Sequence, residues 1–302
     1  MIMLPFAVFG LGVVLLLGGA DLLVRSASKI AKTLGISEFV IGVTVVAFGT
    51  SIPEVGTSVY SALIGHTEIA YGNVVGSNVA NIALVLGIAS LFGTFAMKKK
   101  DVGDLPVLLL SAALTFLVAV DLKVVWWEGI ILMAVYAAYL YKIVKKQEQN
   151  IRSKGRDVKA KTLLTLLTSI IFIYLGARLS INGAVEIASI FGISESVIGF
   201  TLVALSTSLP ELAASVIAVF RKKIGISIGN IIGSNIFNSL IALGAASLAA
   251  TITLSPPDLL FQVPAMLALT IFLVWTVRDL KITKLEGMLL ILAYLLIIAR
   301  LF

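Results

Sequence analysis

The chain has 302 residues, of which 59% are hydrophobic and 13% are charged, and its mean hydropathy is +1.09. Soluble domains carry about 25% charged residues, so this composition excludes a soluble globular protein and indicates a membrane protein. The formal net charge is +7, and the chain has no cysteine and one histidine, which excludes disulfides and argues against thiolate or multi-histidine metal sites.

Apolar stretches follow one another along the chain, each long enough to cross about 30 Å of hydrocarbon at about 1.5 Å per residue. We predict ten transmembrane helices and therefore an all-α membrane protein. The first stretch is interpreted as a span and not as a signal peptide, because no basic residue precedes it and no small-residue cleavage site follows it. The spans are expected near residues 3–24, 36–64, 69–96, 105–122, 124–144, 162–182, 193–220, 225–250, 257–277 and 285–302.

Lysine and arginine gather in every second loop between these spans. Of the 23 basic residues, 20 lie in five loops that fall on one side of the membrane. The positive-inside rule places these loops in the cytoplasm of a cell-membrane protein and both termini outside. The strict alternation with the spans disfavours the alternative of phosphate-binding patches, so no nucleic-acid partner is expected. The five loops are 25–35, 97–104, 142–161, 221–223 and 278–284.

The sequence repeats itself at a constant offset of 157 residues. The segment LGISEFVIGVTVVAFGTSIPE at 34–54 matches FGISESVIGFTLVALSTSLPE at 191–211, with 14 of 20 positions identical from Gly35 to Glu54. The segment GNVVGSNVANIALVLG at 72–87 matches GNIIGSNIFNSLIALG at 229–244 at 8 of 16 positions. Each half holds five spans, an odd number, so equivalent helices cross the bilayer in opposite directions, as in the inverted repeats of secondary transporters.

This repeat sets the expected domain organisation. We predict a first five-helix repeat over 1–144, a cytoplasmic connecting loop over 145–161, and a second, inverted five-helix repeat over 162–302.

Each half carries a proline followed by a glutamate inside an apolar span. Glu54 follows Pro53 in the second span, and Glu211 follows Pro210 in the seventh. Proline leaves carbonyl oxygens one turn earlier without helical partners, and a bilayer tolerates such oxygens only where neighbours, water or an ion satisfy them. Hard cations bind carbonyl, hydroxyl and carboxylate oxygens together, so the pattern indicates a cation site.

Further polar side chains follow these two motifs at helical spacing. Thr50 and Thr207 each lie four residues before a glutamate and share its helix face. Hydroxyls in helices have the alternative role of bonding helix carbonyls, and asparagines that of joining helices, so both alternatives stay open. Two polar stripes at intervals of four are formed by Asn73, Ser77 and Asn81 and by Asn230, Ser234 and Asn238.

The cost of burying charge argues that the two glutamates have a function. An ionisable side chain near the bilayer centre costs about 2.5 to 3.5 kcal/mol, and no basic residue lies at a depth equivalent to Glu54 or Glu211. Their expected counterions are therefore mobile, either metal cations or protons; the alternative is that both are protonated packing residues. No phosphate-binding loop is present, so we predict a transporter driven by an ion gradient, not an ATP-driven pump and not an enzyme.

The motifs GTSIPE at 49–54 with GNVVGSN at 72–78, and STSLPE at 206–211 with GNIIGSN at 229–235, closely resemble the paired alpha-repeats of the sodium/calcium exchanger family. The resemblance covers essentially the whole chain, which looks like a minimal prokaryotic member. It implies secondary-active exchange of Na⁺ for Ca²⁺ by alternating access, with the first and sixth helices moving against the other eight. Ser206 replaces the glycine expected before Thr-Ser, and Asn238 stands where potassium-dependent relatives carry aspartate, so the resemblance implies a potassium-independent exchanger.

The resemblance also implies roles for individual residues. Glu54 and Glu211 would bind Ca²⁺ with the carbonyls of Thr50 and Thr207, and no cofactor beyond the transported Ca²⁺ and Na⁺ is expected. Two carboxylates are neutralised by one Ca²⁺ or by two Na⁺, so a third Na⁺ would make the cycle electrogenic. Asn81 and Asn238 would complete the centre, and flanking Na⁺ sites would be formed by Ala47, Ser51, Ser77, Ala204, Ser208 and Ser234.

Three other functions remain compatible with the residues. A proton/calcium exchanger would use the same buried carboxylates, although that branch carries glutamates in its Gly-Asn motifs, where this chain has serine and asparagine. A cation channel would need no matched inverted halves. A purely structural membrane protein would leave the duplicated carboxylates unexplained. The sequence leaves the oligomeric state open and is compatible with a monomer.

Overall fold

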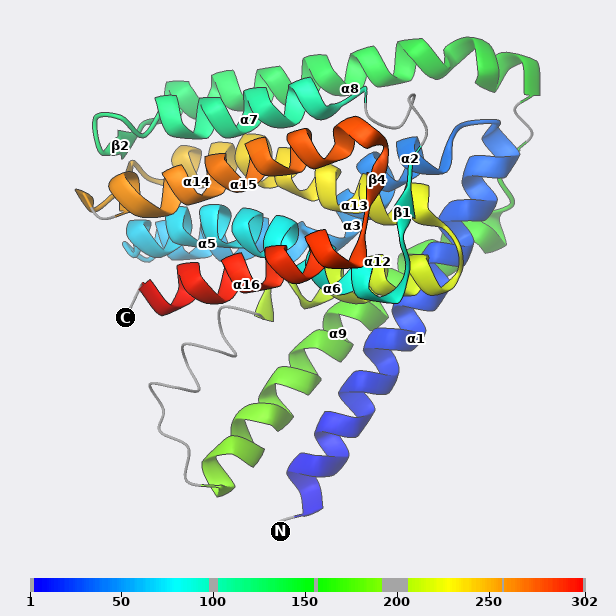
Figure 1. Cartoon of the computed structure of the whole chain (residues 1–302), viewed down its shortest axis with the longest axis horizontal. Helices are drawn as coiled ribbons and strands as arrows, with labels where there is room; N and C mark the ends of the chain where they lie inside the picture. Colours follow the sequence, from blue (N-terminus) through cyan, green and yellow to red (C-terminus); the bar gives the residue numbers. More distant parts are fainter. Residues whose placement is uncertain (1–2, 98–102, 155–156, 192–205, 257, 301–302) are drawn as a thin grey trace.

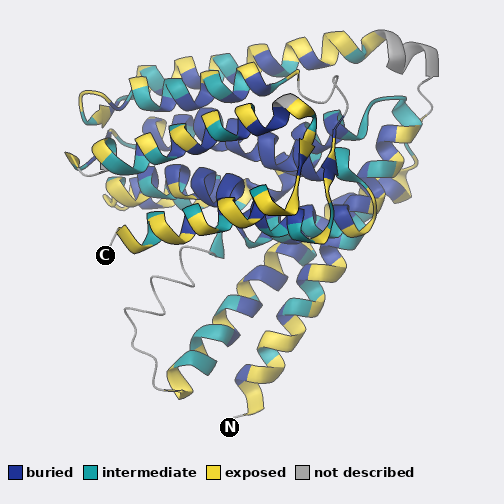
Figure 2. Cartoon of the chain, in the orientation of Figure 1, coloured by how far each residue is buried: buried dark blue, intermediate teal, exposed yellow. Residues whose placement is uncertain are grey.

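The computed structural model describes residues 3–97, 103–154, 157–191, 206–256 and 258–300 of the chain, without the side chains of 149–154, 258 and 278. Nearly all described residues are helical. Figure 1 shows helices lying side by side in one body, from which α1 and α9 project together. Figure 2 shows that the buried residues concentrate in the middle of this body and that its outer helices carry the exposed ones.

The projecting pair consists of α1 (Met3–Leu34) and α9 (Ala160–Ile190). Glycines bring the two backbones into contact. A Cβ atom on Gly12 would lie 2.3 Å from the backbone nitrogen of Ser180, and one on Gly176 would lie 2.3 Å from that of Leu16. No other residue fits at these positions, which explains why two long apolar helices pack along so much of their length.

The second span is bent close to its proline. It is built from α2 (Glu38–Ile41), the π-helical turn η1 (Gly42–Val46), α3 (Ala47–Thr50) and α4 (Ile52–Leu63). The two halves of the span meet at 43°, at Ser51, and Pro53 lies in the first turn of α4. Proline is tolerated there because the first N–H groups of a helix have no intrahelical partner.

The equivalent break in the second repeat precedes α12 (Leu209–Phe220). Its N-cap, Ser208, has φ −88° and ψ 0°, close to the −94° and 8° of Ser51, and Pro210 again lies in the first turn. The earlier part of the predicted seventh span, 192–205, lies outside the described residues.

Two largely apolar helices that carry the polar stripes run through the centre of the molecule. The first comprises α5 (Thr67–Ala80), η2 (Asn81–Val85) and α6 (Leu86–Phe92); the second comprises α13 (Ile224–Phe237), η5 (Asn238–Ala242) and α14 (Leu243–Ala249). In the most apolar stretch of each continuous helix, about four-fifths of the residues are buried inside the protein. In both, a π-helical turn begins at the asparagine that the sequence repeat aligns, and such turns occur frequently at functional sites.

The remaining helices cover this centre. They are α7 (Leu105–Leu117), α8 (Trp126–Lys154), η6 (Asp258–Gln262), α15 (Val263–Thr276), the 3₁₀ turn η7 (Val277–Asp279) and α16 (Lys284–Arg300). Helix α8 reaches well into the interval 145–161 for which we expected a connecting loop. Lysine, glutamine and glutamate are good helix formers, and no glycine or proline interrupts 130–154, so the helix continues after its apolar part has ended.

Two short antiparallel strand pairs, absent from our predictions, join distant parts of the chain. Strand β1 (Phe95–Ala96) pairs with β4 (Lys281–Ile282), and β2 (Lys123–Val124) pairs with β3 (Ile252–Thr253). Each pair therefore connects one strand from the first half of the chain with one from the second.

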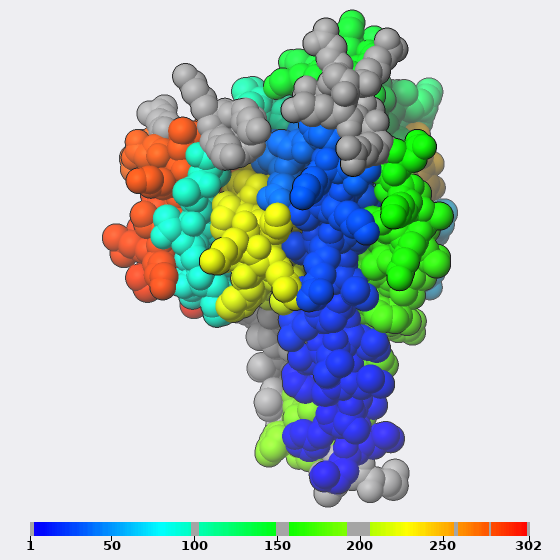
Figure 3. All heavy atoms as spheres, turned by 90° about the vertical axis from the view of Figure 1, so that its right-hand side faces the viewer, coloured from blue at the N-terminus to red at the C-terminus, as the bar shows by residue number. Residues whose placement is uncertain are grey.

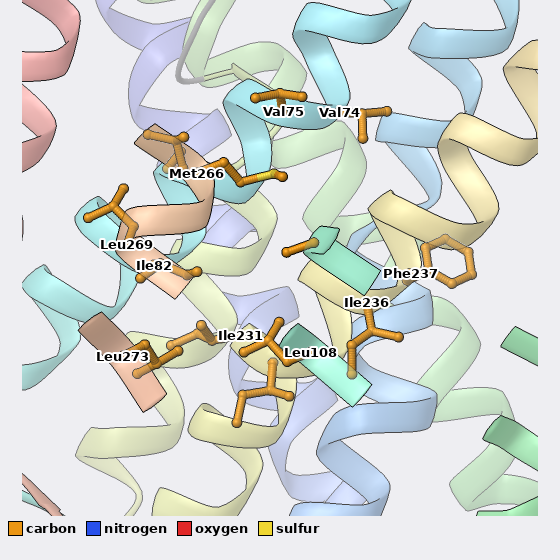
Figure 4. Close-up of a cluster of buried hydrophobic side chains, with 14 of the residues drawn as sticks. Val74, Val75, Ile82, Leu108, Ile231, Ile236, Phe237, Met266, Leu269 and Leu273 are labelled. Atoms are coloured by element: carbon orange, nitrogen blue, oxygen red, sulfur yellow. The ribbon is translucent and has the colours of Figure 1, made fainter. Parts of the chain in front are cut away.

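The apolar interior of the body is continuous across the two halves. Figure 4 shows Val74 and Ile82 of the first half together with Ile231 and Phe237 of the second, with Leu108 of α7 between them. The space-filling view of Figure 3 shows α1 extending away from this body. Both central helices are thus held in place by packing on their apolar sides.

Within the described residues, six helices are long and apolar enough to cross a membrane, or seven when the bent second span counts as one. Helices α7 and α12 are shorter apolar helices. Large apolar side chains are exposed on the outside of the bundle, for example Val14 of α1 and Leu164 of α9. The prediction of an all-helical, multi-pass membrane protein is confirmed.

Candidate ion-binding site

The two glutamates of the repeated motifs occupy equivalent positions in the fold. Glu54 lies in the first turn of α4 and Glu211 in the first turn of α12, directly after the two proline-containing breaks. Both side chains are fully buried. The partial positive charge of a helix N-terminus favours a carboxylate at this position.

The two carboxylates differ in their hydrogen bonds. Oε1 of Glu211 accepts hydrogen bonds from Ser51 Oγ at 2.8 Å and from Ser234 Oγ at 3.5 Å. Oε2 of Glu211 and both carboxylate oxygens of Glu54 have no hydrogen-bond partner among the described residues. Buried carboxylate oxygens without donors are strongly disfavoured unless a positive charge or a proton satisfies them.

In the described part of the chain, no lysine, arginine or histidine forms an ion pair with either of the two buried glutamates. The ion pairs recorded there involve Asp21 and Glu38 and neither of the two buried glutamates. Within the described residues, the carboxyl groups of Glu54 and Glu211 are therefore buried without a fixed positive partner.

Contacts between the two repeats bring the predicted residues together. Ser51 follows α3 in the first half of the chain and reaches Glu211 in the second. Ser77 of α5 makes a similar contact, with its Oγ 3.2 Å from Oγ1 of Thr207. Residues from both motifs, far apart in sequence, therefore meet at one place.

The central asparagines are the most notable unpartnered groups. Asn81 and Asn238 are fully buried, and neither the oxygen nor the nitrogen of either amide has a hydrogen-bond partner among the described residues. The hydroxyl of Ser208 is also buried and unpartnered. Most of the buried unpartnered side-chain atoms of the described chain belong to these three residues and to the two glutamates.

The hydroxyl of Thr50 bonds helix carbonyls, which is the alternative role that the sequence left open. Its Oγ1 lies 3.2 Å from the carbonyl oxygen of Val46 and 3.3 Å from that of Ala47, and 3.0 Å from Oδ1 of Asn230. Its hydroxyl therefore bonds within the protein. Ala47 is buried, and its carbonyl also accepts the backbone N–H of Ser51 at 3.0 Å. Ala204 lies outside the described residues.

Two asparagines that we did not assign to the site, Asn73 and Asn230, each bond the backbone of a glutamate and the hydroxyl of a serine. Nδ2 of Asn73 donates to the carbonyl of Glu54 at 3.1 Å and to Ser58 Oγ at 2.9 Å. In the second repeat, Nδ2 of Asn230 donates to the carbonyl of Glu211 at 3.4 Å and to Ser215 Oγ at 3.1 Å. Ser58 and Ser215 are separated by the same 157 residues as the motifs, which is the signal that would have identified them.

A cavity adjoins the two breaks. It has a volume of about 600 Å³ and lies between the bent second span and α9, where Ile170 and Tyr174 line it. Thr50, Pro53 and Pro210 also line it, so open space reaches the helix breaks beside the two glutamates.

Comparison with known proteins identifies the family. The family described as sodium/calcium exchanger protein matches residues 4–145 and 161–302. The chain is 34% identical to the uncharacterized membrane protein MJ0091 of Methanocaldococcus jannaschii and 33% identical to the sodium/calcium exchanger MaX1 of Methanosarcina acetivorans, in each case over 100% of this chain and 99% of the relative.

A solved structure of the sodium-calcium exchanger NCX_Mj, soaked without Na⁺ and Ca²⁺, superposes over 100% of both chains with a TM-score of 0.88 and 32% sequence identity. A second structure of the same exchanger, soaked with 2.5 mM Na⁺ and 10 mM Sr²⁺, also gives a TM-score of 0.88, at 34% identity over 99% of both chains. The resemblance of the repeated motifs is thereby confirmed, and the chain is a membrane transporter that belongs to the sodium/calcium exchanger family.

Proposed function

We propose that this protein is a secondary-active antiporter that exchanges Na⁺ for Ca²⁺ across the cell membrane without a requirement for K⁺. One observation carries the proposal. Two fully buried carboxylates, one from each repeated motif, leave three oxygens without a hydrogen-bond donor and have no fixed cation beside them among the described residues. Two of the similar proteins, MaX1 and NCX_Mj, are named sodium/calcium exchangers, which supports the same ions.

The proposed Ca²⁺ site is centred on Glu54 and Glu211. Ca²⁺ takes about six to eight oxygen ligands, which the two carboxylates, the carbonyls of Thr50 and Thr207 and the amide oxygens of Asn81 and Asn238 can provide in part. The unpartnered amides support this assignment. The flanking Na⁺ sites are assigned to Ala47, Ser51, Ser77, Ala204, Ser208 and Ser234.

Charge neutralisation couples the two fluxes. One Ca²⁺ or two Na⁺ neutralise the charge of both carboxylates. Ca²⁺ and Na⁺ therefore cannot occupy the site at the same time. A third Na⁺ leaves the Na⁺-loaded site positive, and each cycle then moves one net charge across the membrane.

The proposed architecture has ten spans in two inverted five-helix repeats, 1–144 and 162–302, joined by a cytoplasmic connection. The two segments that match the family, 4–145 and 161–302, support this division. The five basic loops face the cytoplasm and both termini lie outside. Alternating access follows from movement of α1 and α9, which project together from the body (Figure 1), against the other helices. One chain suffices for this cycle.

Substitution of either glutamate tests the site. Glu54→Gln and Glu211→Gln each remove one negative charge from a buried ion site; because a charge-assisted contact contributes about 1.5 to 3 kcal/mol, we expect Na⁺-dependent Ca²⁺ uptake into proteoliposomes to fall by at least about tenfold. The control is Glu68→Gln, which removes an exposed carboxylate from α5 and is expected to leave uptake unchanged. Full uptake by either buried-site variant would remove the proposed site.

The driving ion is tested in the same vesicles. We expect Ca²⁺ uptake with a Na⁺ gradient and no K⁺, and no uptake with a pH gradient alone. Uptake driven by pH in the absence of Na⁺ would instead identify a proton/calcium exchanger. Ca²⁺ flux that is independent of any ion on the opposite side would indicate a channel.

A further inference from the structure

A basic stripe follows the apolar part of α1. Residues 4–24 span about 31 Å at 1.5 Å per residue, which is the thickness of the hydrocarbon layer, so the continuation of α1 to Leu34 lies at the membrane surface. Arg25, Lys29 and Lys32 occupy this continuation. Their spacing of four and three residues places them on one helix face.

A pocket of about 300 Å³ lies against this stripe. The turn between α12 and α13 forms its other side through Arg221 and Lys223, and Val24 and Ser28 complete its lining. Five of its seven lining residues are therefore basic. In the space-filling view of Figure 3, the yellow surface around the α12–α13 turn lies beside the blue surface of the N-terminal helices.

Two carboxylates fix the walls of the pocket without neutralising it. Asp21 of α1 forms ion pairs with Arg25 at 2.8 Å and with Arg221 at 2.5 Å. Glu38 of α2 forms an ion pair with Lys223 at 2.5 Å and accepts a hydrogen bond from Ser28 at 3.0 Å. The pocket thus keeps an excess of three positive charges.

Two of these three excess charges reside on α1, and the third is shared by Arg25 and Arg221, which both pair with Asp21. Within the described part of the chain, neither Lys29 nor Lys32 has an ion-pair partner, and both side chains are exposed. An anion that enters the pocket would meet these two ammonium groups while the paired arginines present their remaining N–H donors.

We propose that this pocket binds the phosphate of an anionic phospholipid headgroup. The position of the pocket selects a lipid over free phosphate: Val24 at its edge is the last residue of the apolar span, so a headgroup held by the basic residues leaves its acyl chains beside that span. Basic pockets between transmembrane helices at the membrane surface are typical sites for anionic headgroups. Arginine and lysine are the usual hydrogen-bond donors to phosphate oxygens. The bound lipid bridges α1 and the α12–α13 turn.

Lipid titration of the purified full-length protein tests this proposal by native mass spectrometry. We expect one molecule of dioleoyl phosphatidylglycerol to bind at least about tenfold more tightly than dioleoyl phosphatidylcholine, because only the first has a net negative headgroup. The double substitution Lys29→Gln/Lys32→Gln is expected to lower the phosphatidylglycerol affinity by about tenfold or more. Lys29→Arg/Lys32→Arg keeps both charges and is expected to retain the affinity.

The matched control is Lys142→Gln/Lys145→Gln, which removes the same charge from exposed positions of α8 and is expected to leave the affinity unchanged. Equal loss in both glutamine variants would show diffuse surface attraction and overturn the proposal. So would equal affinity of the wild-type protein for the two lipids, or displacement of phosphatidylglycerol by an equal concentration of inorganic phosphate. Every readout is binding, so the result is independent of whether the protein exchanges Na⁺ for Ca²⁺.

Discussion

The buried asparagines of the described chain differ in their hydrogen bonding. Asn81 and Asn238 each leave both amide atoms without a protein partner, whereas Asn230 donates to Glu211 and to Ser215. An asparagine that joins helices loses a hydrogen bond when it is replaced. Replacing an asparagine that binds an ion breaks no hydrogen bond in the ion-free protein, because the polar atoms of that asparagine have no protein partner.

The substitution Asn81→Leu separates these roles. It removes a buried polar group without a partner, and such a group costs about 1 to 3 kcal/mol, so we expect the midpoint of thermal unfolding in ion-free buffer not to fall. The stabilisation that Ca²⁺ provides, about 2.7 kcal/mol for a ligand at 100 times its Kd, should be largely lost. Asn230→Leu serves as the comparison, with a lower midpoint expected. A lower ion-free midpoint for Asn81→Leu with Ca²⁺ stabilisation retained would assign Asn81 to helix packing.

Part of the candidate site could be predicted from residues alone. The cost of a carboxylate within the bilayer identified Glu54 and Glu211, and both are fully buried. The unequal hydrogen bonding of these two residues could not be predicted, because their sequence neighbourhoods are almost the same. It arises from contacts between the repeats, such as that of Ser51 with Glu211, and depends on how the two halves are placed. The ligand roles themselves stay predictions.

At the scale of the helix, hydropathy marks the membrane more reliably than it marks helix ends. Pro53 was predicted to leave carbonyl oxygens of the preceding turn without helical partners, and the span bends by 43° at Ser51, two residues before it. Helices α1, α8 and α9 all continue well past their predicted ends, at 24, 144 and 182. The continuations of α1 and α8 are polar but contain good helix formers such as alanine, lysine and glutamine. The π-helical turns and the two-residue strands were missed, since neither has a hydrophobic period that a single sequence reveals.

The contact between α1 and α9 leads to a prediction at this scale. Gly12→Ala and Gly176→Ala each place a methyl group within 2.3 Å of backbone atoms of the opposite helix, and overpacking costs about 1 to 3 kcal/mol. We expect both variants to unfold at lower temperature in detergent. Gly18→Ala lies on the same α1 helix with nothing within 4 Å of the new atom and should be neutral or slightly stabilising. An equal loss in all three variants would contradict the proposed role of backbone contact.

For the whole molecule, the charge of the transported load decides whether voltage affects exchange. With Na⁺ inside vesicles and Ca²⁺ outside, exchange of three Na⁺ for one Ca²⁺ exports one positive charge per cycle. We therefore expect an inside-positive potential, set with K⁺ and valinomycin, to accelerate Ca²⁺ uptake and an inside-negative potential to slow it. The same K⁺ gradients without valinomycin are the control. A rate of Ca²⁺ uptake that does not change with the membrane potential would indicate electroneutral exchange of two Na⁺ for one Ca²⁺.

The two strand pairs have a consequence for biosynthesis. Strand β1 at Phe95 and Ala96 acquires its partner only when Lys281 and Ile282 have been made, and at about 5 to 20 residues per second the ribosome needs on the order of 10 to 40 s to reach them. During that interval the backbone groups of β1 have no partner strand. The β1–β4 pair therefore forms only after nearly the whole chain has been made, and a ribosome that stalls before Lys281 leaves β1 unpaired.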